Sequence, residues 1–218
     1  MVFLYFCSQT NLNMVEIGRM NRLKAVKMVD FGMYLDGGEG VEILLPTRYV
    51  PVGGKVGDEL DVFIYQDNQG RLIATTDTPL AQVGEFRFLK VKAVNQVGAF
   101  LEWGIMKDLL VPFKEQKVQM REGKYYLVYV HLDHVSKRIV ASARIDKYLN
   151  NVMPDYVVNE EVDLLVADET GIGYKVIVNN LHWGLVYYNE VFRRLEKGER
   201  LKGYVKGIRE DDKIDVSV

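Results

Sequence analysis

The chain has 218 residues, of which 48% are hydrophobic and 27% charged, and its formal net charge is −2. This composition is typical of a folded globular protein, and the small net charge argues against a strongly basic nucleic-acid binder. Cys7 is the single cysteine, which excludes an intramolecular disulfide and a cysteine-based zinc site. Since no apolar run approaches the roughly 18 residues that a membrane span requires, we expect a cytoplasmic protein with no membrane partner.

A short glycine-containing motif occurs three times, at residues 31–35, 97–101 and 172–176. The motif glycines are Gly32, Gly98 and Gly173. Counting 14 residues forward from each leads to the end of an apolar run, at Pro46, Pro112 and Tyr187. Counting 25 residues forward leads to a second glycine, at Gly57, Gly123 and Gly198. Three copies that agree in both spacings indicate an internal repeat of about 70 residues.

Each copy contains short strand patterns separated by turn residues. In the first copy they cover 23–28, 31–35, 41–45, 60–64 and 71–75. In the second they cover 88–94, 97–101, 108–111, 126–130 and 139–141. In the third, a strand before the corner at 168–170 is followed by 172–176, 183–187, 201–205 and 214–216. We also expect a helix at 189–195, a short helical linker at 144–151, and a short helix or loop at 113–120.

Five short strands per copy favour a closed barrel, because closure removes the exposed edges of a five-stranded sheet. The sequence therefore predicts an all-β fold of three tandem five-stranded oligonucleotide-binding (OB) barrels. The expected domains are residues 14–80, 81–149 and 150–218. Residues 1–13 lie outside the repeat and are expected to be an N-terminal extension or an upstream start, with a docked extra strand as the alternative.

Charge is distributed unevenly over the three copies. Residues 81–149 carry 12 basic and 7 acidic side chains, a net charge of +5, whereas 14–80 and 150–218 are net −3 and −4. Since attraction to phosphate depends on the local field, the middle copy is the electrostatic candidate. Lys90 and Lys92 occupy alternating strand positions and share a face there. We expect them to contact phosphates, with a solvated strand edge as the alternative.

Several of these features resemble the S1 RNA-binding domain: the glycine-aromatic strand, the run GLVY at 184–187, and the glycine before the fourth strand. Three such units, opening with IGRMNRL at 17–23 and FGMYLD at 31–36, resemble the conserved virulence factor B family of bacterial S1 proteins. The resemblance covers residues 14–218. In that family a C-terminal winged helix follows the S1 units. The sequence ends at Val218 without one, so we expect a truncated chain or a departure from the family.

The resemblance also implies which residues form the RNA-binding face. S1 domains carry an aromatic before the strand-two glycine, another two residues after it, an aromatic or histidine ending strand three, and a basic residue opening strand five. At these positions the three units have Phe31, Tyr34 and Arg71; Phe100 and Arg138; and Lys175, Tyr187 and Lys213. No unit has the full set, which favours weak sites used together. Ordinary strand packing is the alternative for each aromatic.

No residue pattern indicates catalysis or a bound cofactor. The sequence shows no Ser/His/Asp set, nucleophilic cysteine or paired catalytic carboxylates, so we do not expect an enzyme. His131 and His134 have no evident third ligand, and therefore no metal site is expected. The stretch Gly171-Ile172-Gly173 lacks the third glycine and the helix of a dinucleotide-binding loop.

Two functions remain open from the sequence. The first is a protein that binds single-stranded RNA by aromatic stacking and phosphate contacts; the resemblance alone implies that it regulates gene expression. The second is a protein-interaction scaffold that docks to the ribosome or RNA polymerase, which the net negative first and third units favour.

Overall fold

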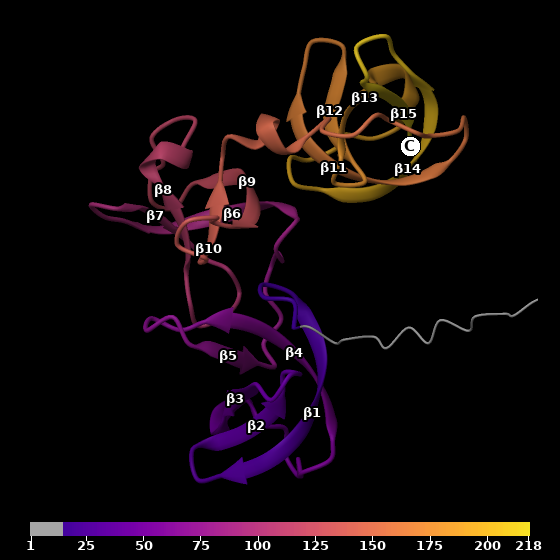
Figure 1. Ribbon diagram of the computed structural model, residues 1–218. Helices are drawn as coiled ribbons and strands as arrows, with labels where there is room; N and C mark the ends of the chain where they lie inside the picture. Colours follow the sequence, from indigo (N-terminus) through magenta and orange to yellow (C-terminus); the bar gives the residue numbers. More distant parts are fainter. Residues whose placement is uncertain (1–14) are drawn as a thin grey trace, which may run out of the picture. The chain divides into compact units, whose positions relative to one another are not determined.

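The computed structural model describes residues 15–218, and the predicted N-terminal extension at 1–13 lies outside them. The described chain consists of short β-strands with four brief 3₁₀ helices. It divides into two compact units, a first that ends at Thr78 and a second from Pro79 to Val218 (Figure 1). The first unit contains one five-stranded barrel, and the second contains two five-stranded sheets. The predicted all-β fold of three tandem OB-type barrels is confirmed.

The first barrel closes in the strand order β1-β2-β3-β5-β4. Its strands are β1 (Met20–Val29), β2 (Gly32–Asp36), β3 (Glu42–Pro46), β4 (Glu59–Gln66) and β5 (Leu72–Thr75). The only parallel pairing in this barrel joins Leu44 of β3 to Ile73 of β5, and it completes the closure. A short 3₁₀ helix, η1 (Thr47–Tyr49), follows β3.

The first sheet of the second unit has the same strand topology, but its two end strands are not joined to each other by a β-ladder. Its strands are β6 (Phe86–Val94), β7 (Gly98–Leu101), β8 (Leu109–Pro112), β9 (Tyr125–Leu132) and β10 (Ile139–Ser142). They pair in the order β10-β9-β6-β7-β8. Near the seam between β10 and β8, the amide of Ala143 donates to the carbonyl of Glu115 in η2 (Phe113–Glu115), at 2.9 Å.

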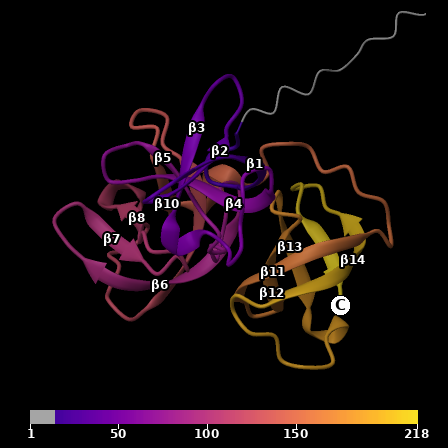
Figure 2. The ribbon, with the colours of Figure 1, turned by 90° about the horizontal axis from the view of Figure 1, so that it is seen from below.

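The last sheet of the second unit closes fully, in the order β11-β12-β13-β15-β14. Its strands are β11 (Glu161–Glu169), β12 (Gly173–Val178), β13 (His182–Tyr187), β14 (Arg200–Ile208) and β15 (Ile214–Ser217). The turned view in Figure 2 shows these strands curving around one interior. Inward-facing side chains such as Val176, Val186 and Val205 fill that interior and are fully buried.

The motif glycines allow two strands of each barrel to approach closely. Gly32, Gly98 and Gly173 pair directly with Pro46, Pro112 and Tyr187, the residues 14 positions further on. A Cβ at Gly173 would lie 2.1 Å from the backbone oxygen of Val186, and the other two glycines face the same obstruction. Only glycine fits such an approach. The repeat spacing therefore reflects the register between the second and third strands.

The second set of glycines holds a β-bulge in each barrel. The amide of Gly57 donates to Ala25 O, that of Gly123 to Val91 O, and that of Gly198 to Val166 O, each at 2.8 Å. The register of the first strand shifts immediately after each of these three acceptors. Bulges bend a strand and increase its twist, which lets five strands curl into a barrel.

The helix predicted at 189–195 is wrong. The structure has a single 3₁₀ turn there, η4 (Tyr188–Glu190), and an irregular segment follows it. The segment includes Val191 and Phe192, which are weak helix formers, and seven residues rarely offset the cost of helix nucleation. Burial of Leu195 in the barrel core anchors the segment instead. The helical linker predicted at 144–151 is present as η3 (Ile145–Tyr148), again a 3₁₀ helix.

Within the second unit the two sheets share a hydrophobic cluster. It consists of Phe86, Ile145, Leu149, Leu165, Ala167, Ile177 and Trp183. A side-chain nitrogen of Arg200 donates to the carbonyl of Phe86 at 2.8 Å. The Asn150 side chain accepts the amide of Trp183 at 2.9 Å, while its backbone amide donates to Leu181 O. Apolar packing and these hydrogen bonds together join the linker and both sheets.

Candidate nucleic-acid interface

The first barrel brings three predicted residues onto one outer face. Phe31 lies at the corner before β2 and its side chain is 58% exposed. Its ring meets that of Tyr34 edge to face, with centroids 6.4 Å apart. The Lys27 ammonium lies 5.9 Å from the centroid of the Tyr34 ring. Because β2, β3 and β5 are neighbours, Tyr34 and Arg71 line one shallow hollow of about 350 Å³.

Arg71 is held in this hollow by a carboxylate from the same hairpin. Its Nε donates to Asp67 Oδ2 at 2.8 Å, and a terminal nitrogen lies 2.7 Å from the same oxygen. The Arg71 side chain is nevertheless 73% exposed. An exposed ion pair of this kind contributes little to stability, so a phosphate can compete for the cation.

The predicted residues of the second barrel are more dispersed. Phe100 on β7 is half-buried, and Arg138 is exposed ahead of β10, which within residues 15–218 pairs only with β9. Lys90 lies 3.6 Å from a carboxylate oxygen of Glu102, and Lys92 lies 2.9 Å from one of Asp108. These neighbouring carboxylates, which the net charge of +5 already includes, pair with the two lysines that the sequence assigned to phosphate. The assignment of these four residues to RNA stays a prediction.

The third barrel places its predicted residues in different surroundings. Lys175 on β12 lies over the ring of Trp183, with its ammonium 3.6 Å from the ring centroid. Tyr187 ends β13 opposite Gly173 and is half-buried. Lys213 forms an ion pair with Asp211 in the hairpin before β15. Of these three residues, Lys175 packs over an aromatic ring and Lys213 pairs with a carboxylate.

The sequence did not reveal that the outer face of β12 and β13 in the third barrel is partly covered. Ile177 and Trp183 point outward from β12 and β13, yet both are buried against the second barrel. The apolar run from Leu164 to Ala167 gave the available signal, because a strand with one solvated face alternates polar and apolar residues. A run without alternation indicates burial on both sides of the sheet.

His131 packs beside two aromatic rings. Its ring lies 6.4 Å from that of Tyr129 and 5.3 Å from that of Tyr148. Burial lowers the pKa of His131, and the hydrogen bond to the carbonyl of Leu132 opposes the shift. Across residues 15–218, no three His, Cys, Asp or Glu side chains form a group suited to a metal ion.

The lowered pKa of His131 predicts a pH-dependent stability. Because the folded state binds fewer protons at this imidazole than the unfolded chain, stability falls as the pH drops through the usual histidine value of 6.5. We expect a lower Tm at pH of about 5.5 than at about 7.5, and a smaller difference in the His131→Gln variant. Thermal unfolding at both pH values measures this, and an equal pH dependence in the variant would contradict it.

No helix among residues 15–218 combines the length and apolar content needed to cross a bilayer.

Comparison with known proteins identifies the class of the first barrel. Residues 17–77 match the S1 domain family. A crystal structure of a multidomain protein with nucleic acid binding domains from Streptococcus pneumoniae superimposes with a TM-score of 0.50 at 18% sequence identity. That match covers 92% of this chain and 73% of the other, and it supports the fold.

Curated relatives then support a particular family. The chain is 26% identical over 215 residues to the protein YitL of Bacillus subtilis, covering 92% of this chain and 70% of YitL. It is 27% identical over 116 residues to conserved virulence factor B of Staphylococcus aureus, covering 50% of this chain and 39% of that protein. These matches support the resemblance to the conserved virulence factor B family of S1 proteins that the repeat motifs predicted.

Proposed function

We propose that this protein binds single-stranded RNA through its tandem S1-type barrels, without catalysing a reaction, and that this binding regulates gene expression. The pneumococcal protein, which has nucleic acid binding domains, supports a nucleic-acid role for the shared fold. The S1 match to residues 17–77 supports RNA as the ligand of the first barrel. The proposed setting is the cytoplasm.

The observation that carries the proposal is the aromatic and basic set of the first barrel. An exposed Phe31, the adjoining Tyr34 and the two cations Lys27 and Arg71 occupy one outer face. An unpaired base can stack on such rings whatever its sequence, and the cations hold the adjoining phosphates. A duplex keeps its bases stacked inside, so this face favours single strands.

We further propose that the segments 14–80, 81–149 and 150–218 contribute separate weak sites on one strand. Phe100 with Lys90, Lys92 and Arg138 forms the second site, and Tyr187 with Lys213 belongs to the third. Each additional site binds at an effective concentration set by its tether to the first. Overall affinity then exceeds that of any single barrel.

The experiment is fluorescence anisotropy with a labelled single-stranded RNA of about 15 nucleotides, a size that spans one or more OB sites. A duplex and a DNA of the same sequence serve as controls. We expect the single-stranded RNA to bind most tightly. For about three phosphate contacts, log K should fall with log salt concentration with a slope of about −2.

A second function would give a different result. Net charges of −3 and −4 on residues 14–80 and 150–218 suit a protein partner such as the ribosome or RNA polymerase better than RNA. Absence of RNA binding at low salt, together with a co-purifying partner that resists ribonuclease, would replace the RNA proposal with this scaffold role.

A further inference from the structure

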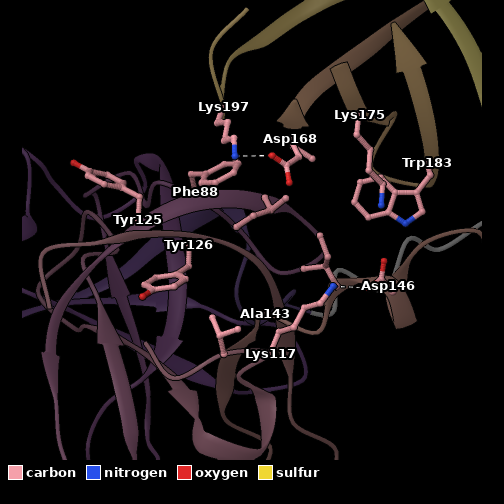
Figure 3. A pocket seen from close by; sticks show the side chains of 14 residues that line it. Phe88, Lys117, Tyr125, Tyr126, Ala143, Asp146, Asp168, Lys175, Trp183 and Lys197 are labelled. Atoms are coloured by element: carbon pink, nitrogen blue, oxygen red, sulfur yellow. Dashed lines mark ion pairs between the residues drawn. The ribbon is translucent and has the colours of Figure 1, made fainter. Parts of the chain in front are cut away.

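A cleft in the second unit lies where its two barrels meet. The cleft has a volume of about 350 Å³. Figure 3 shows the side chains of its walls, which come from both barrels. The second barrel contributes Phe88, Tyr126 and Lys117, and the third contributes Lys175 and Trp183. Trp183 is 8% exposed, and the methylene-bearing side chain of Lys175 covers its ring. The cleft thus combines aromatic surfaces with cations that originate from two different barrels.

Two of the three lysines that line this cleft form ion pairs with carboxylates, and the third does not. Lys117 lies 3.5 Å from a carboxylate oxygen of Asp146, and Lys197 lies 2.5 Å from one of Asp168 (Figure 3). No ion pair of residues 15–218 involves Lys175, whose ammonium lies over the Trp183 ring. Three lysines and two aspartates leave one positive charge in the cleft without a carboxylate.

The surroundings of Lys175 favour an anion. Burial lowers its pKa, Asp146 and Asp168 oppose the shift, and the ammonium groups of Lys117 and Lys213 lower it further. Since these ammonium groups repel one another, a phosphate between them would relieve that repulsion and gain charge-assisted hydrogen bonds. Half-buried cations strengthen such bonds, because water screens them less than it screens surface charges.

We propose that this cleft binds one nucleotide of single-stranded RNA, with the phosphate at Lys175 and Lys117 and the base against the ring of Phe88, next to Trp183. The proposal rests on the proposed function and extends it to a site that neither barrel forms alone. In this proposal the outer face of the third barrel takes part in RNA binding although the second barrel covers part of it. The volume lies at the lower end of small-ligand pockets, which fits a single nucleotide rather than a helix.

Intrinsic fluorescence tests the cleft directly, because the protein has two tryptophans and only Trp183 lines it. Trp103 is 2% exposed and donates to Ala81 O, so it supplies a constant background. We expect titration with a uridine oligonucleotide of about 10 residues to change the tryptophan emission. The change should be absent in Trp183→Phe, and inorganic phosphate at the same concentration should not reproduce it.

Two variants isolate the phosphate contacts. Lys117→Glu changes a side chain that is 70% exposed and should leave the fold intact, while Lys175→Gln removes the half-buried charge without reversing it. Hydrogen bonds to charged groups contribute enough that each variant should bind the oligonucleotide about tenfold more weakly. Lys24→Glu, an exposed β1 position of the first barrel outside both sites, makes the same charge change as Lys117→Glu and should have a much smaller effect.

The outcomes separate this proposal from the general function. Oligonucleotide binding by anisotropy with an unchanged Trp183 signal, or equal losses in Lys117→Glu and Lys24→Glu, would overturn the cleft while RNA binding stands. An equal response to inorganic phosphate would reduce the cleft to an anion site and overturn it as a nucleotide site. Absence of any binding by anisotropy would overturn both proposals.

Discussion

Replacing Gly173 by alanine is expected to lower the free energy of unfolding of the second unit by about 3 kcal/mol or more. The added Cβ would lie 2.1 Å from Val186 O and 2.8 Å from the Cα of Tyr187. Both are backbone atoms of the paired strand, so neither can move aside without opening the β12–β13 ladder. Urea unfolding followed by circular dichroism measures the change.

Gly171 supplies the matched control two residues earlier. A Cβ there would meet nothing within 4 Å, so Gly171→Ala should change stability by less than about 1 kcal/mol. Gly32→Ala and Gly98→Ala should resemble Gly173→Ala, because their Cβ positions fall 2.3 and 2.2 Å from a backbone oxygen. Similar stabilities for Gly171→Ala and Gly173→Ala would refute the close-approach explanation of the repeat.

Removal of both aromatic rings from the first barrel is expected to weaken single-stranded RNA binding about 100-fold. Each stacked base contributes ~1–3 kcal/mol, and 100-fold corresponds to ~2.8 kcal/mol. The double variant Phe31→Ala with Tyr34→Ala tests this by anisotropy. Tyr34→Leu keeps apolar volume in the half-buried position and should lose affinity without losing stability.

Phe192 provides the control for exposed aromatic surface. Its side chain is 97% exposed in the segment after η4, outside the proposed face. Phe192→Ala should leave RNA affinity within about twofold, since an isolated ring without nearby cations holds a strand poorly. Losses of equal size in Phe192→Ala and the Phe31–Tyr34 variant would show that the stacking surface is elsewhere.

The fold was predictable because its constraints are local or repeat at a fixed interval. Gly32, Gly98 and Gly173 mark a close strand approach, and the spacing of 14 residues to Pro46, Pro112 and Tyr187 is the strand register itself. The helix predicted at 189–195 is instead a loop that Leu195 anchors to the barrel core. Weak helix formers and the burial of Leu195 both favour the loop over a helix there.

The candidate site was less predictable because it depends on contacts between distant segments. The sequence assigned Lys90 and Lys92 to phosphate contacts, yet in the structure they form ion pairs with Glu102 and Asp108. Trp183 and Lys117 belong to different repeats, and no spacing within one repeat joins them. Their meeting follows from the hydrophobic cluster between the two barrels, which includes Phe86 and Ile177.

We expect one strand of RNA to contact both the Phe31–Tyr34 face and the cleft at Lys175. Chemical-shift mapping tests it most directly, with the isotope-labelled full chain titrated by a single-stranded RNA of about 15 nucleotides. We predict shifts that concentrate on β2, β3 and β5 of the first barrel and on the lining of the cleft, including the Trp183 indole. Shifts confined to other surfaces, or none at saturating RNA, would contradict the account.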